Sequence, residues 1–176
     1  MTRGDIMQKS SIPNSLTFGN LICGVLSIQF TMQQNFKVAA ALILLAGVLD
    51  RYDGTVARLL GVSSPLGKEL DSLADLVSFG VAPSMLIFTL YRLSNLGFIG
   101  YSTLIIFPVA GAFRLARYNS SEFNNVFTGI PITIAGSIMA IYAIFTENMQ
   151  PRVTVTVILM LVFSYLMVSK LQIKKR

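Results

Sequence analysis

The amino-acid sequence predicts an all-α protein that crosses a membrane several times. Of its 176 residues, 53% are hydrophobic and only 12% are charged, a balance typical of an integral membrane protein rather than a cytosolic one. The apolar residues gather into six stretches joined by short connections, which leave no room for a soluble domain. We therefore expect a single integral membrane domain over residues 1–176, with one helix for each apolar stretch.

The six stretches approach the length that a membrane-spanning helix needs, about 20 residues. They are Leu16–Met32, Val38–Leu60, Pro65–Tyr91, Leu96–Leu115, Phe127–Phe145 and Val153–Ser169. The first and last are the shortest, and the first also carries the polar residues Asn20 and Gln29. The preceding segment Met1–Ser11 is polar and lacks the apolar run of a cleavable signal peptide, so we expect no targeting segment to be removed.

A helix stop and a helix start separate the second and third stretches. Gly61 follows the last expected helical residue, Ser64 is a suitable N-cap, and Pro65 suits the first helical position. The second and third helices are therefore expected to form an antiparallel hairpin.

The basic residues predict the orientation in the membrane. With six spans both termini lie on one side, and that side holds eleven basic residues: Arg3, Lys9, Arg51, Arg58, Lys68, Arg114, Arg117, Lys170, Lys174, Lys175 and Arg176. The other side holds Lys37, Arg92 and Arg152. Because Lys and Arg concentrate in cytoplasmic loops, we expect a multi-pass protein of the cell membrane with both termini in the cytoplasm.

Because the protein has a net charge of +6, we expect it to interact with the phosphate groups of membrane lipids. The basic residues form no continuous face interleaved with aromatic side chains, so the sequence does not favour nucleic acid as a partner.

The residue types also limit the chemistry. The chain has no histidine and a single cysteine, Cys23, which excludes a histidine base, a zinc site and an intrachain disulfide. A metal must therefore bind to oxygen atoms, which favours Mg²⁺, Mn²⁺ or Ca²⁺, with Mg²⁺ or Mn²⁺ the usual companions of phosphate chemistry. A general base must be a carboxylate, a tyrosine or a lysine.

Four of the eight acidic residues lie between positions 50 and 75, namely Asp50, Asp53, Asp71 and Asp75. Residues three or four apart share one face of a helix, so each helix of the hairpin presents two of these carboxylates. Asp53 lies eleven residues before Ser64 and Asp75 eleven after it, which places both roughly 15 Å from the turn. The four carboxylates should converge, and such anions need cations nearby.

Small residues on the same faces indicate the ligand. Gly54, Ala57 and Gly67 leave room for a bulky group beside the helix backbone, and Arg58 can bind a phosphate oxygen. Two cations about 4 Å apart are the natural interpretation of four carboxylates around a diphosphate. A membrane cation carrier would also place acidic residues on facing helices, but it needs neither the arginine nor the glycine-lined space.

These residues resemble the signature of the CDP-alcohol phosphatidyltransferase family, D-x2-D-G-x2-A-R-x8-G-x3-D-x3-D, at every defined position. The resemblance covers essentially the whole chain and implies that family's fold, with six transmembrane helices and a cytoplasmic active site. It implies transfer of a phosphatidyl group from a CDP-linked lipid to an alcohol, with release of CMP. It also implies a homodimer.

The resemblance implies roles for individual residues. Asp50, Asp53 and Asp71 would hold two Mg²⁺ or Mn²⁺ ions, while Asp75 would help to ligate them and act as general base. The segment Pro13–Thr17 is similar to the family's first conserved segment. Residues that would bind the CDP-lipid are Asn14, Thr17, Gly54, Ala57, Arg58, Ser64 and Gly67. Asn14 and Thr17 are equally suited to capping a helix.

The acceptor alcohol is indicated by residues that the general signature leaves open. The segment Glu69–Pro83 is similar to the membrane-embedded members that use L-serine, as are Phe113–Asn119 and Phe127–Ile132. Members that use glycerol 3-phosphate usually carry Pro and Lys where this chain has Ser72 and Leu76. The resemblance thus implies CDP-diacylglycerol and L-serine as substrates, with a phosphatidylglycerophosphate-type synthase as the alternative.

Three residues are candidates for contacting the serine. Arg114 and Arg117 share one face near a cytoplasmic helix end and could hold its carboxylate, with Asn119 beside them. The arginines could equally be ordinary cytoplasmic anchors, and Asn119 could cap the helix end.

Overall fold

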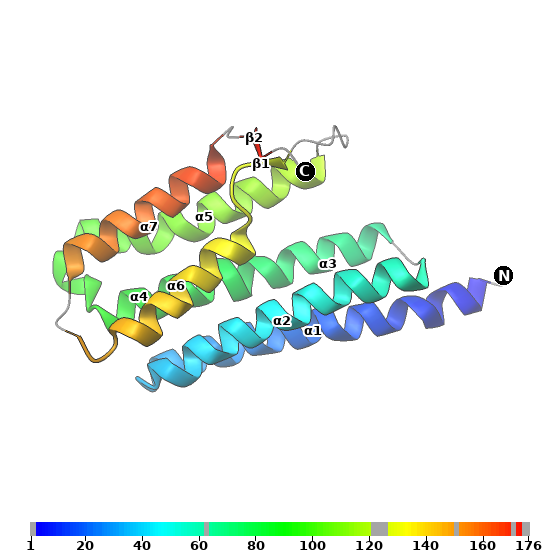
Figure 1. The fold of residues 1–176 in the computed structure, drawn as a ribbon, viewed down its shortest axis with the longest axis horizontal. Coiled ribbons are helices and arrows are strands. Elements are labelled where there is room, and N and C mark those ends of the chain that lie inside the picture. The colour runs from blue at the N-terminus through cyan, green and yellow to red at the C-terminus, as the bar shows by residue number, and fades with distance from the viewer. Residues whose placement is uncertain (1–2, 62–63, 121–126, 150–151, 170–171, 174–176) are drawn as a thin grey trace.

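The computed structural model describes residues 3–61, 64–120, 127–149, 152–169 and 172–173, and side chains for residues 14–56, 59, 61, 64–120, 129–149 and 152–169. Within this part of the chain, six helical segments follow one another and alternate in direction (Figure 1). The six expected helices are thus all present, and the chain is an all-α membrane protein.

Helix α1 spans Arg3–Met32, and α2 spans Phe36–Leu60. The third segment runs without a break through α3, the π-helical turn η1 and α4, which span Pro65–Asp75, Leu76–Val81 and Ala82–Leu90. The 3₁₀ turn η2, Leu93–Leu96, precedes α5, which spans Phe98–Ser120. The last two helices are α6, Ile132–Thr146, and α7, Val153–Val168. The two-residue strands β1, Phe127–Thr128, and β2, Gln172–Ile173, pair antiparallel.

Several predicted boundaries are wrong. α1 begins at Arg3 rather than near Leu16, because the polar segment continues the helix. The fifth segment begins at Ile132 rather than Phe127, since Gly129 has a φ of 76° and Pro131 serves as the N-cap. The fourth begins after Gly97, whose φ is 55°.

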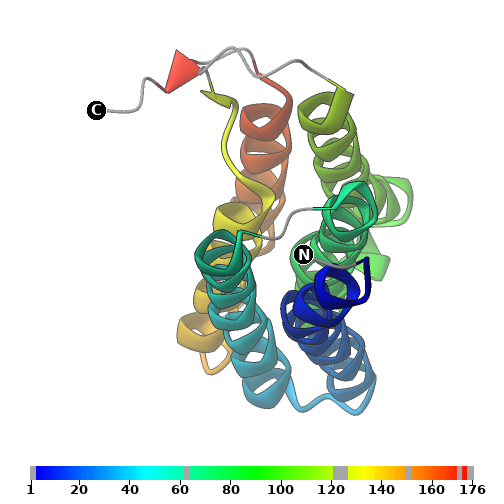
Figure 2. The ribbon, with the colours of Figure 1, turned by 90° about the vertical axis from the view of Figure 1, so that its right-hand side faces the viewer.

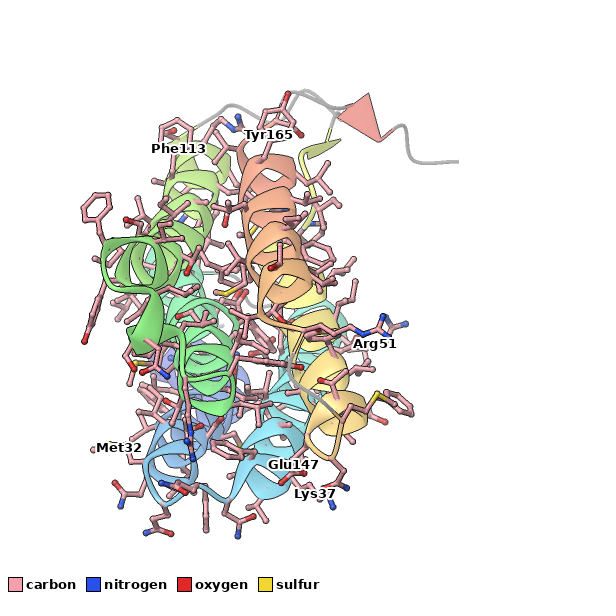
Figure 3. All side chains as sticks on the ribbon, turned by 90° about the vertical axis from the view of Figure 1, so that its left-hand side faces the viewer. Met32, Lys37, Arg51, Phe113, Glu147 and Tyr165 are labelled. Carbon is pink, nitrogen blue, oxygen red and sulfur yellow. The ribbon has the colours of Figure 1, made fainter. Side chains whose placement is uncertain are left out.

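Within the described ranges, three segments are long and apolar enough to cross a membrane by themselves: Asn14–Met32, Pro65–Leu90 and Phe98–Ser120. α6 and α7 are apolar but shorter. α2 joins an apolar first half to a charged second half that carries Asp50 and Asp53. Large apolar side chains such as Phe113 and Tyr165 project from the outside of the bundle, as expected of a lipid-facing surface (Figure 3).

The core lies where α3, η1 and α4 pass between the other helices. α1 packs most extensively against α2 and also contacts α3, η1 and α4, while α5 packs against α7. The first three helices lie together in the lower part of the end-on view, with α5 and α7 above them (Figure 2). Phe79 of η1 is fully buried, and Gly136 of α6 lies directly on its backbone. This close contact fixes the η1 turn that follows Asp75.

Candidate functional site

The α2–α3 hairpin has the predicted turn. α2 ends before Gly61, which has a φ of 62°. Ser64 is the N-cap of α3, its Oγ accepts a hydrogen bond of 2.9 Å from the Gly67 backbone N–H, and Pro65 is the first helical residue. The turn reverses the chain direction between α2 and α3 (Figure 1).

Three aspartates converge across this hairpin. Carboxylate oxygens of Asp50, Asp53 and Asp71 all lie within 4.8 Å of one another. Asp53 is buried and the other two are half-buried. The Asp71 Oδ1 atom is buried and has no hydrogen-bond partner among the described residues. An orphaned carboxylate oxygen within an oxygen-only cluster fits a hard divalent cation.

Asp75 is buried, with 7% of its surface exposed, about as little as Asp53. It follows Asp71 by four residues on α3, so the two aspartates share one face of the helix. The Nδ2 atom of Asn20, on α1, donates a hydrogen bond of 3.1 Å to Asp75 Oδ1. Asp75 is thus connected to the cluster on one side and to α1 on the other.

α1 contributes two further predicted residues. The Thr17 hydroxyl is buried and donates a hydrogen bond of 3.0 Å to Asp53 Oδ2. The Asn14 side chain lies beside Gly67, where an added Cβ would be 3.4 Å from Asn14 Oδ1 and 3.1 Å from Ser64 Oγ. Asn14, Ser64 and Gly67 therefore form one cluster at the start of α3.

Gly54 faces open space, since a Cβ added there would meet no atom within 4 Å in the described structure. A ligand can therefore approach the α2 backbone beside Asp53. The backbone of Ala57 and Arg58 continues α2, and the side chains of these two predicted residues lie outside the described part.

A groove of about 630 Å³ runs between α2 and α6 and reaches the acidic cluster at Asp50. Its other lining residues are Leu44, Gly47, Val48, Arg51, Tyr52, Thr55, Thr133, Ile134, Ser137 and Ile138. The wall is mainly apolar, with polar groups near Asp50. Arg51 projects outward from the bundle (Figure 3).

The three candidates on α5 differ in their surroundings. Arg114 is 9% exposed, its Nε has no hydrogen-bond partner in the described structure, and its charge acts on Asp75. Arg117 donates to the backbone carbonyl of Val168, at 2.9 Å, near the end of α7. The Asn119 Nδ2 atom donates to Ser72 Oγ at 3.0 Å and joins α5 to α3.

Asn20 and Ser78 also contribute to the site, although neither was predicted from the sequence. Asn20 is fully buried, and its backbone carbonyl accepts a hydrogen bond of 2.9 Å from the Ser78 hydroxyl. The spacing of polar residues could have indicated the role of Asn20. Thr17, Asn20 and Ser27 lie three and seven residues apart, which places them on one face of an otherwise apolar helix.

A model of the CDP-alcohol phosphatidyltransferase family matches residues 10–168. The chain belongs to this family. Its members are generally dependent on divalent metals, in agreement with the carboxylate cluster. Family membership and the apolar helices together make this a multi-pass membrane protein.

Several relatives share the same printed name, CDP-diacylglycerol–serine O-phosphatidyltransferase. The one from Bacillus subtilis is 41% identical over 162 residues, which cover 92% of this chain and 88% of the relative. The one from Helicobacter pylori strain J99 is 38% identical over 139 residues, 77% of this chain and 58% of the relative. The one from Methanocaldococcus jannaschii is 39% identical over 131 residues, 74% of this chain and 59% of the relative.

Proposed function

We propose that the chain, as a single membrane domain, transfers the phosphatidyl group of CDP-diacylglycerol to the hydroxyl of L-serine, giving phosphatidylserine and CMP. The observation that carries this proposal is the convergence of the Asp50, Asp53 and Asp71 carboxylates beside the open space at Gly54. Serine as acceptor is supported by the name of the Bacillus subtilis relative, which aligns with 92% of this chain.

The donor would lie along α2. Its diphosphate would occupy the space beside Gly54 and the acidic cluster, and its acyl chains would enter the groove between α2 and α6. The CDP portion would contact the cluster of Asn14, Ser64 and Gly67 at the start of α3, with Ala57 and Arg58 on the last turns of α2. Thr17 would act mainly by holding Asp53, to which it donates.

Asp50, Asp53, Asp71 and Asp75 would hold the divalent cations, two Mg²⁺ or Mn²⁺ ions. Bound there, the cations would neutralise the diphosphate and the charge that develops on the departing CMP. Asp75 would accept the proton of the serine hydroxyl. The hydroxyl oxygen would then bond to the phosphorus of the phosphatidyl group as the bond from that phosphorus to the bridging oxygen breaks. CMP would leave with both electrons of that bond.

The acceptor would bind between Asp75 and α5. Arg114 has a buried nitrogen without a partner in the described structure and lies within electrostatic reach of Asp75, so it suits the serine carboxylate. Arg117 and Asn119 would shape the rim of this site through their bonds to α7 and α3.

We further propose that both termini and the active site face the cytoplasm, where serine and the nucleotide are available. The excess of Lys and Arg on the terminal side supports this orientation.

Small residues of α5 and α6 such as Gly111 and Gly136 permit close helix contacts. Family resemblance supports a homodimer.

The test supplies purified protein with CDP-diacylglycerol, Mn²⁺ and one acceptor at a time: serine, glycerol 3-phosphate or inositol phosphate. We expect CMP release and a phosphatidylserine product with serine. A lipid product only with glycerol 3-phosphate would show a phosphatidylglycerophosphate-type synthase instead. No CMP release with any acceptor would contradict the enzymatic proposal and favour a cation carrier.

A further inference from the structure

The described contacts include one amide that bonds to the carboxylate proposed as the base. The Asn20 side chain is fully buried in α1, three residues after Thr17. Its Nδ2 atom donates to Asp75 Oδ1 at 3.1 Å. An ionised carboxylate only accepts hydrogen bonds, so the amide nitrogen rather than the amide oxygen must face Asp75.

Two contacts bring α1 close to η1 near Asn20. The backbone carbonyl of Asn20 accepts a 2.9 Å hydrogen bond from the hydroxyl of Ser78, which lies in the π-helical turn η1 directly after Asp75. One turn further along α1, a Cβ added to Gly24 would be 2.8 Å from the Ser78 Cα. The absence of a side chain at Gly24 therefore lets α1 approach η1 closely enough for Asn20 to reach Asp75.

We infer that Asn20 is a positioning residue for the transfer reaction. It engages the Oδ1 atom of Asp75, so that the second oxygen, Oδ2, is directed to the acceptor hydroxyl. Asp75 would rotate without this bond, because a carboxylate turns readily about its terminal torsion. This inference rests on the proposed function, in which Asp75 takes the proton of the acceptor.

The direct test is Asn20→Leu, which keeps a side chain of similar size and removes the donor. Outer hydrogen-bond partners of metal-ligating carboxylates typically contribute roughly 10–100-fold to metal affinity or activity. We expect kcat with saturating serine to fall by that factor, counted per mole of protein that binds CDP-diacylglycerol. The KM for CDP-diacylglycerol should stay close to wild type, and the affinity for Mn²⁺, measured by electron paramagnetic resonance, should fall much less than kcat.

The matched control is Ser27→Ala. Ser27 is also fully buried on α1, and its hydroxyl donates a 2.9 Å hydrogen bond to the Ala39 carbonyl of α2. This variant loses a buried bond of the same helix without touching the acidic cluster. Its Tm should fall about as much as that of Asn20→Leu, while its kcat stays near wild type.

The inference is overturned if kcat of Asn20→Leu equals that of Ser27→Ala, or if Mn²⁺ or CDP-diacylglycerol affinity falls in step with kcat. Should Asn20→Leu fail to fold, Asn20→Thr carries the same test, since threonine is too short to reach Asp75. The proposed function fails separately, in the wild type, if serine releases no CMP. The variants are then compared with whichever acceptor reacts, and inactivity with every acceptor overturns both proposals.

Discussion

Replacing Asp71 by asparagine should change the stability of the protein in opposite directions with and without metal. Oxygens of Asp50, Asp53 and Asp71 lie within 4.8 Å of one another. At an effective dielectric constant of about 20, two unit charges at that distance repel by roughly 3.5 kcal/mol. Asp71→Asn removes two of the three repulsive pairs while keeping the size of the side chain.

Protons and solvent relieve part of this repulsion in the metal-free protein. We therefore expect Asp71→Asn to stabilise the chelator-treated protein by roughly 1 kcal/mol, which corresponds to about 2–4 °C in Tm. With Mn²⁺, wild type should have the higher Tm of the two. The stability of wild type rises with the logarithm of the ratio of free Mn²⁺ to its Kd, whereas the variant has lost a charged ligand, binds Mn²⁺ more weakly and gains little.

Thermal unfolding in detergent, with and without Mn²⁺, measures both effects. Glu69→Gln is the matched control, because Glu69 lies on the same helix, is exposed, and makes its described hydrogen bond with Asn119. It should respond to Mn²⁺ like wild type. A lower Tm for Asp71→Asn in chelator, or an undiminished response to Mn²⁺, would refute the assignment of the cluster as a cation site.

Five other variants, used in three comparisons, test the base, the packing of α6 on η1, and the serine site. Asp75→Asn should abolish CMP release yet leave CDP-diacylglycerol binding largely intact; loss of binding together with turnover would contradict its role as base. Gly136→Ala should destabilise by about 1–3 kcal/mol, because its Cβ would lie 2.5 Å from a carbonyl oxygen of η1. Gly47→Ala, whose Cβ would have ordinary contacts of 3.5 Å and more, is the control in the same unfolding measurement. Arg114→Gln should raise the KM for serine more than Arg117→Gln does. Arg117→Gln should mainly lower Tm, because it loses the hydrogen bond to a backbone carbonyl of α7. A larger rise in the KM for serine with Arg117→Gln would instead place the serine carboxylate at Arg117.

The parts of the site that could be predicted from sequence are those governed by local rules. Ser64 and Pro65 specify a helix start, and the spacing of the aspartates specifies which helix faces they share. Together these two rules predict that Asp50, Asp53 and Asp71 converge, as the structure shows.

Other features depend on contacts between distant segments. The π-helical turn after Asp75 is stabilised by the approach of Gly24 and Gly136 to η1, and no local pattern marks it. From the sequence, Asn20 is only a polar residue within the first apolar stretch. Its role could not be predicted, because its hydrogen-bond partner, Asp75, lies 55 residues away. The strand at Phe127 pairs with Ile173, which a hydropathy pattern alone cannot reveal.

We propose above all that the aspartate cluster binds divalent cations in contact with the diphosphate of the lipid donor. Electron nuclear double resonance on Mn²⁺-loaded protein with CDP-diacylglycerol tests this directly, since ³¹P couples strongly only to Mn²⁺ that touches phosphate oxygen. We expect strong ³¹P coupling in wild type and its loss in Asp53→Asn. Mn²⁺ bound to wild type without ³¹P coupling, or coupling that persists unchanged in Asp53→Asn, would contradict it.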